Sequence, residues 1–163
     1  MKRHILTIAL ATTALCTTAN AAELRMSWWG GDSRHAATQE ALKACGEKHG
    51  HTINPEYTGW DGHFEKLTTQ IAGKTEADIM QVNWPWLPIY SKNGDGFADL
   101  NAFSDTIDLS NWDASQLEDG TRNGKLMAWD NGRLSLMVTI SPSLHWFSAS
   151  CAWSLVDFLT NLP

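Results

Sequence analysis

Alternating strand-like and helix-like segments between residues 23 and 90 restrict the possible folds of this chain most strongly. The first is an apolar run, ELRMSWW, that ends at two glycines, and small apolar residues at helical spacing follow it. The expected elements are strands at 23–29, 52–57 and 77–82, helices at 34–48 and 61–73, and a short helix ending near Tyr90. Strands that alternate with helices in this way pair in parallel. The sequence therefore predicts an α/β fold with a parallel sheet built from β-α-β units.

The N-terminus has the pattern of a secretory signal peptide. Lys2 and Arg3 precede a short apolar run, and Ala19-Asn20-Ala21 is the small-x-small triplet that signal peptidase cuts after. The apolar run is too short to span a bilayer as a stable helix. We therefore expect residues 1–21 to be removed, with cleavage near Ala21, and the remaining chain to be periplasmic.

The charge balance argues against two classes of partner. Removing Lys2 and Arg3 from the 12 basic residues leaves 10, against 18 acidic residues, which is a formal charge of −8 for the rest of the chain. Nucleic acids and anionic membranes are bound by clustered lysine and arginine. We therefore expect no nucleic-acid partner and no anionic-membrane surface.

No motif in the sequence indicates a metal, a cofactor or a catalytic nucleophile. There is no Cys-x-x-Cys, no His-Glu-x-x-His and no Gly-x-Ser-x-Gly. Asp61, His63 and Glu65 are the nearest acid–base group, but solvated helix residues explain them better. Cys45 and Cys151 could pair in an oxidising compartment or remain unpaired. The expectation is a protein without cofactors that is not an enzyme.

Aromatic and polar residues gather where the expected strands end. Ligands of open α/β sheets bind at the carboxyl ends of the strands, and tryptophan rings stack on the apolar faces of sugars. The candidate ligand-binding residues are Trp29, Asp32, Arg34, His35, Trp60, Asn83, Trp84 and Trp86. Core packing is the alternative for the tryptophans, and solvent exposure is the alternative for Arg34 and His35. A turn with a helix N-cap is the alternative for residues 30–33.

Several segments resemble a known family. The segments LRMSWWGGDSRH, EYTGWDGHFEKLTTQIAG and ADIMQVNWPW, then IDLSNWD and NGKLMA, are similar to bacterial extracellular solute-binding proteins of the carbohydrate ABC-importer type, particularly to oligogalacturonide-type binders. The resemblance implies a periplasmic-binding-protein-like fold of two α/β lobes that close on a sugar. It also implies a carbohydrate ligand, delivery to ABC permease subunits in the inner membrane, and a monomer. A secreted carbohydrate-active enzyme or a lectin-like sugar-binding module is the alternative.

The resemblance ends before the chain does. It covers residues 23–128, which would be part of the first lobe, and the second lobe is missing. Residues 129–163 contain no lysine and no glutamate, and their sequence does not match the expected crossover into a second lobe. We interpret residues 129–163 as an atypical tail, out of frame or non-native, in which residues 134–140 could pair at a sheet edge. The resemblance therefore implies a truncated or frameshifted member that does not function as a fragment.

Overall fold

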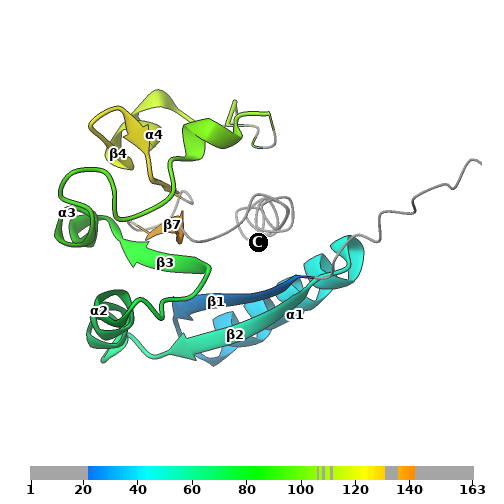
Figure 1. Ribbon diagram of the computed structural model, residues 1–163. Coiled ribbons are helices and arrows are strands. Elements are labelled where there is room, and N and C mark those ends of the chain that lie inside the picture. Colours follow the sequence, from blue (N-terminus) through cyan, green and yellow to red (C-terminus); the bar gives the residue numbers. More distant parts are fainter. Residues whose placement is uncertain (1–21, 106, 108, 111, 131–135, 142–163) are drawn as a thin grey trace, which may run out of the picture.

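The computed structural model describes residues 22–105, 107, 109–110, 112–130 and 136–141. The expected signal peptide, Cys151 and most of the expected tail lie outside these residues. The main sheet has the strand order β2-β1-β3-β7-β6, and a small second sheet pairs β4 with β5 (Figure 1). The strands are β1 (Glu23–Trp29), β2 (Thr52–Thr58), β3 (Ile79–Asn83), β4 (Thr121–Arg122), β5 (Lys125–Leu126), β6 (Ala128–Asp130) and β7 (Leu136–Ile140). The helices are α1 (Asp32–His49), α2 (His63–Gly73), η1 (Trp84–Trp86), α3 (Leu87–Tyr90), η2 (Leu100–Phe103) and α4 (Ala114–Asp119).

The first three strands confirm the expected parallel arrangement. β1 pairs in parallel with β2 from Glu23 to Trp29, and it pairs in parallel with β3 at Met26 and Ser27. β2 lies at the edge of the sheet, where Pro55 is tolerated because it has no N–H to donate to a second neighbour. The mixed α/β architecture and its three parallel strands thus follow from the alternation in the sequence.

Both helix starts differ from the sequence-based expectation. α1 begins at Asp32 rather than at residue 34, with Gly31 as its N-cap residue and no side-chain cap. α2 begins at His63 rather than at residue 61, after Gly62, which has a φ of 85°. Glycine adopts this left-handed conformation without steric cost, and the turn uses this freedom in place of a side-chain cap.

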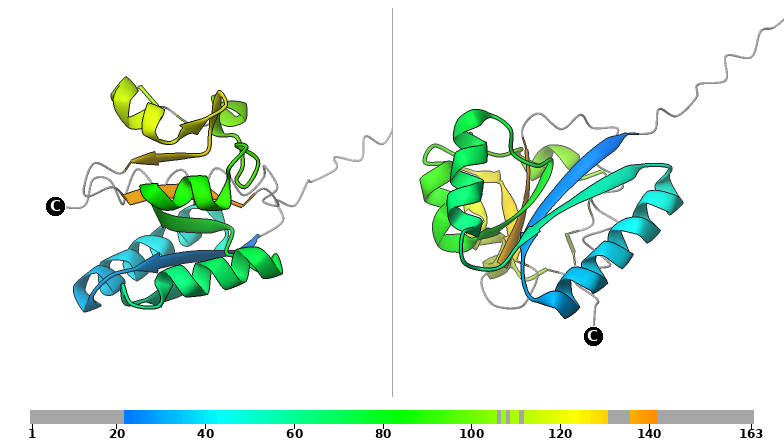
Figure 2. Two further views of the ribbon diagram at one scale, coloured as in Figure 1. Left: turned by 90° about the vertical axis from the view of Figure 1, so that its left-hand side faces the viewer. Right: turned by 90° about the horizontal axis from the view of Figure 1, so that it is seen from below.

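The two long helices cover opposite faces of the sheet (Figure 2). Ala41, Leu42 and Cys45 of α1 share a buried cluster with Met26 and Trp28 of β1. On the other face, the buried Leu67 of α2 shares a second cluster with strand residues that include Met80 and Val82.

Adjacent residues at the end of β1 therefore point to different layers. The ring of Trp28 contacts His35 of α1, and the ring of Trp29 contacts His63 of α2.

Antiparallel strands extend the sheet beyond residue 128. β7 pairs with β3 from Leu136 to Ile140, and β6 pairs with β7, so β7 lies inside the sheet (Figure 1). Residues 136–140 thus pair with the sheet as expected for the run 134–140, but they do not form its edge, because β6 covers the outer side of β7. The sheet also includes residues 129 and 130, on the tail side of the boundary that the sequence suggested.

The helices described above include no candidate for a membrane span. No helix in the part of the chain that the structure describes is both long and apolar enough to cross a bilayer.

η2, α4 and the β4–β5 sheet form the upper part of the molecule in Figure 1. Gly120, directly after α4, lies so close to the carbonyl oxygen of Ala128 that no side chain fits there.

Candidate functional site

Three turns at the carboxyl edge of the parallel strands bring aromatic rings together. Trp29 ends β1, Trp60 lies in the turn after β2, and Trp86 belongs to η1 after β3. The Trp29 ring centroid lies 5.3 Å from that of Trp60 and 5.5 Å from that of Trp86. Trp60 and Trp86 stack at 5.6 Å with an angle of 25° between their planes. These three tryptophans form the aromatic cluster, and the structure brings them together as the sequence predicts.

The members of the aromatic cluster differ in exposure. Trp29 is only 7% exposed, whereas Trp60 is 54% exposed. The ring of Phe64 of α2 contacts that of Trp86, with ring centroids 5.0 Å apart. Trp29 thus anchors the cluster in the core, and Trp60 offers an apolar ring surface that a sugar could stack on.

His63 and Gln81 support the aromatic cluster, and neither is among the ligand-binding residues predicted from the sequence. His63 is fully buried, so its interpretation as a solvated helix residue is wrong. Its Nδ1 lies 3.1 Å from the Thr58 hydroxyl, and its Nε2 lies 3.2 Å from the Gln81 carbonyl oxygen. Burial lowers the pKa of His63, the hydrogen bond to Gln81 raises it, and nearby Lys66 lowers it, so that the pKa falls below its usual value.

Two signals in the sequence pointed to these residues. His63 follows the glycine-containing turn after a strand, and Gln81 is the polar residue inside the apolar run of β3.

The first turn places Arg34 over a glycine. A Cβ on Gly30 would lie 2.7 Å from Cδ of Arg34, so the absence of a side chain lets the arginine stem cross the backbone directly after Trp29. Burial lowers the pKa of the Arg34 guanidinium from its usual value. No carboxylate of the described residues forms an ion pair with Arg34. Asp32, in the first turn of α1, is exposed.

His35 does not join the aromatic cluster. The indole N–H of Trp28 donates a hydrogen bond to Nδ1 of His35 at 3.1 Å, and the His35 ring stacks on Tyr57 at 4.3 Å. Both partners lie on the α1 side of β1, opposite to Trp29. The structure therefore separates His35 from the aromatic cluster by the thickness of the sheet.

Asn83 and Trp84 lie at the third turn without a ring contact to the aromatic cluster. Asn83 ends β3 and is half-buried, and Trp84 begins η1 with 45% of its surface exposed. Trp84 therefore has exposed ring surface but is not part of the aromatic cluster.

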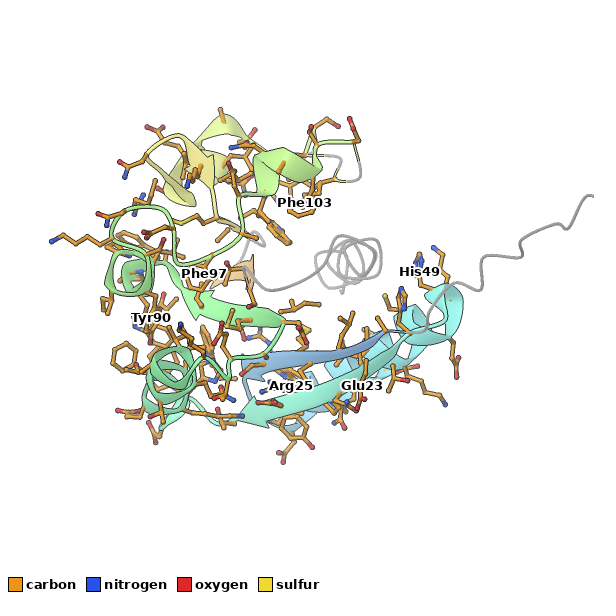
Figure 3. All side chains as sticks on the ribbon, in the orientation of Figure 1. Glu23, Arg25, His49, Tyr90, Phe97 and Phe103 are labelled. Carbon is orange, nitrogen blue, oxygen red and sulfur yellow. The ribbon has the colours of Figure 1, made fainter. Side chains whose placement is uncertain are left out.

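Three charged side chains, from β1, β2 and α2, form ion pairs away from the aromatic cluster. Arg25 of β1, which is labelled in Figure 3, pairs with Glu56 of β2 at 2.6 Å. Lys66 of α2 lies 3.3 Å from the same carboxylate. Burial raises the pKa of Glu56, but hydrogen bonds from Arg25, Gln70 and Lys66 outweigh burial and leave the pKa below its usual value. Arg25 is thus occupied by Glu56, and it is not available to a ligand.

No metal site is visible in the described part of the chain. In residues 22–105, 107, 109–110, 112–130 and 136–141, no three histidine, cysteine, aspartate or glutamate side chains gather closely enough to hold a metal ion.

Comparisons with known proteins identify relatives of this chain in sequence and fold. The family model described as bacterial extracellular solute-binding protein matches residues 31–134. A periplasmic oligogalacturonide-binding protein from Yersinia enterocolitica, solved with saturated digalacturonic acid, is 51% identical at a TM-score of 0.64, over 66% of this chain and 27% of that protein. A periplasmic solute-binding protein from Pectobacterium atrosepticum is 46% identical at a TM-score of 0.62, over 64% of this chain and 26% of that protein. A de novo designed cysteine esterase is 50% identical at a TM-score of 0.64, over 66% of this chain and 27% of that protein. This chain thus spans about a quarter of the length of these structures.

Proposed function

Because the chain belongs to the family of bacterial extracellular solute-binding proteins, we propose that it provides part of the sugar-binding surface of a periplasmic ABC-importer component. The observation that carries the proposal is the aromatic cluster. Trp60 is half-exposed and stacks on Trp86 at the sheet edge where ligands of α/β proteins bind. An exposed indole with a fixed orientation is suited to the apolar face of a pyranose ring.

The proposed ligand is an oligosaccharide that contains uronic acid. Arg34 crosses Gly30 directly after Trp29, and its partly buried guanidinium has no carboxylate partner among the described residues. A guanidinium in this state is suited to bind a carboxylate with two hydrogen bonds. The similar protein from Yersinia enterocolitica, solved with digalacturonic acid, supports this choice.

The described surface alone should bind a sugar weakly. Binding sites normally bury most of a ligand's surface, and the aromatic cluster can cover only one side of a sugar. In the proposed importer, a second lobe would cover the other side, and permease subunits in the inner membrane would receive the ligand. The chain would act there as a binding protein, with no catalytic residue.

The proposal is tested by titrating residues 22–163 with digalacturonic acid and with maltose, followed by tryptophan fluorescence or calorimetry. We expect weak binding of the acidic sugar, with a Kd of roughly 1 mM, which corresponds to a binding free energy of about 4 kcal/mol. We expect still weaker binding of the neutral sugar, which has no carboxylate for Arg34. Trp60→Ala should remove the response, and Arg34→Gln should remove the preference for the acidic sugar. Trp112→Phe, outside the candidate site, is the control and should bind as the original chain does.

Two outcomes would contradict the proposal. If neither sugar binds at concentrations of tens of millimolar, the aromatic cluster is not a sugar site in this chain. If pectic oligosaccharides incubated with the chain are reproducibly hydrolysed, the alternative of a secreted carbohydrate-active enzyme is favoured instead.

A further inference from the structure

The pairing between β1 and β3 stops before the ligand edge of the sheet. The two strands pair only at Met26–Ile79 and Ser27–Met80, so no ladder joins Trp29 to β3. Instead, the backbone N–H of Trp29 donates to the side-chain oxygen of Gln81 at 3.2 Å. A side chain therefore replaces the backbone hydrogen bond at the residue that anchors the aromatic cluster.

His63 fills the same gap from α2. Its Nε2 contacts the backbone carbonyl of Gln81, and its Nδ1 contacts the hydroxyl of Thr58 at the end of β2. Its ring lies 4.9 Å from the Trp29 ring and 6.3 Å from the Trp86 ring, the latter nearly parallel at 26°. One imidazole thus joins the ends of two strands and contacts two rings of the aromatic cluster.

The hydrogen-bond chemistry defines the form of this imidazole. A carbonyl oxygen only accepts, so Nε2 of His63 must carry the hydrogen that is donated to Gln81. In a neutral ring, Nδ1 then accepts from the Thr58 hydroxyl, which can rotate to donate. The lowered pKa of His63 agrees with a neutral ring at neutral pH.

Burying the side chain of Gln81 is energetically unfavourable, because its amide nitrogen has no hydrogen-bond acceptor among the described residues. Its side chain is 2% exposed, and its Nε2 group has no acceptor among the described residues. A buried donor without a partner is unfavourable, so an apolar residue would suit the interior of β3 better. The oxygen of this amide is the group that the Trp29 N–H requires.

We propose that His63 and Gln81 are positioning residues for the sugar-binding aromatic cluster. They replace the missing β1–β3 pairing and hold Trp29 and Trp86 in the orientation in which Trp60 can stack on Trp86. This inference rests on the proposed function for its ligand, but the orientation of the rings can be measured without any sugar.

The first test is nuclear magnetic resonance of residues 22–163. Long-range proton–nitrogen spectra should show His63 as the neutral Nε2–H tautomer at pH 7. The indole N–H signals of Trp29, Trp60 and Trp86, assigned by single Trp→Phe variants, should shift in His63→Leu, and His63→Gln, which retains a donor, should restore much of the original pattern. His51→Gln is the matched control, because His51 accepts a hydrogen bond from Ala22 far from the aromatic cluster. An Nδ1–H tautomer, or indole signals unchanged in His63→Leu, would overturn the proposal.

The second test uses the sugar. For His63→Leu we expect roughly tenfold weaker binding of digalacturonic acid, with partial recovery in His63→Gln, because the rings lose their support. If His63→Leu unfolds the chain, Gln81→Leu provides the same comparison, since it removes only the acceptor of the Trp29 N–H. Unchanged affinity in a folded variant would show a merely structural role. If the original chain binds no sugar while the indole signals respond as expected, the proposed function fails and the positioning role stands.

Discussion

The unequal exposure of Trp29 and Trp60 predicts a clear difference in stability when each is replaced by alanine. Trp29 is 7% exposed, and replacing a buried tryptophan by alanine costs about 3–5 kcal/mol, because burial is lost and a cavity remains. Trp60 is 54% exposed, so about half of the 150–250 Å² that a tryptophan can bury is at stake. At about 25 cal/mol per Å², and with partial burial in the unfolded chain, this corresponds to about 1–3 kcal/mol without a cavity.

Urea unfolding of residues 22–163, followed by far-ultraviolet circular dichroism, measures the difference. With a slope of about 1–3 kcal/mol per M, Trp29→Ala should unfold at a midpoint about 1 M lower than Trp60→Ala. Trp84→Ala is the control for an exposed tryptophan outside the aromatic cluster, and it should cost about as much as Trp60→Ala and less than Trp29→Ala, because Trp84 is 45% exposed. Equal losses for Trp29→Ala and Trp60→Ala would refute the distinction between a buried anchor and an exposed binding surface.

Two further predictions concern the parts of the fold that hold the site. Gly120→Ala should cost about 1–3 kcal/mol in urea unfolding, because its Cβ would collide with the Ala128 carbonyl oxygen, whereas Gly31→Ala meets nothing within 4 Å and should cost at most about 1 kcal/mol. Glu56→Gln should lower the unfolding midpoint at pH 7 more than at pH 3.5. The pKa of Glu56 is below its unfolded value of about 4.3, so its stabilisation is present above that value and is lost as the pH falls through the folded pKa. The exposed Glu47→Gln is the control, and an equal effect of Glu56→Gln at both pH values would contradict this reasoning.

The parallel part of the fold could be predicted because it depends on local patterns. Strand-like runs that end at glycines, and helices between them, required no knowledge of distant contacts, and β1, β2 and β3 lie where the sequence placed them within a few residues. The convergence of Trp29, Trp60 and Trp86 followed from the same pattern, since the carboxyl ends of parallel strands meet at one edge of the sheet.

Other features depend on contacts that local patterns do not show. His63 was interpreted as a solvated helix residue together with Asp61 and Glu65, and only the position of β3 reveals that its ring is buried against Gln81. The sequence does not show that Arg25 has an ion-pair partner, because only the pairing of β1 with β2 places Glu56 beside it. His35 follows the first strand end as Arg34 does, yet the rotation of α1 turns it to Trp28 on the opposite side of the sheet.

The position of β7 leads to a prediction about the C-terminal residues. β7 pairs with β3 along Leu136–Ile140 and with β6 on its other side, so its removal would leave both neighbours with unpaired edges. A chain that ends at Asp130 should therefore lose cooperative unfolding. A chain that ends at Ser141 should keep cooperative unfolding if residues 142–163, the part of the proposed non-native tail 129–163 that follows β7, do not belong to the native fold. It should also be more soluble, because residues 142–163 are rich in apolar side chains. Limited proteolysis of residues 22–163 should then remove residues 142–163 first. If the chain that ends at Ser141 unfolds, or if residues 142–163 resist the protease as a folded unit, those residues belong to the native fold and the proposal of an out-of-frame tail fails.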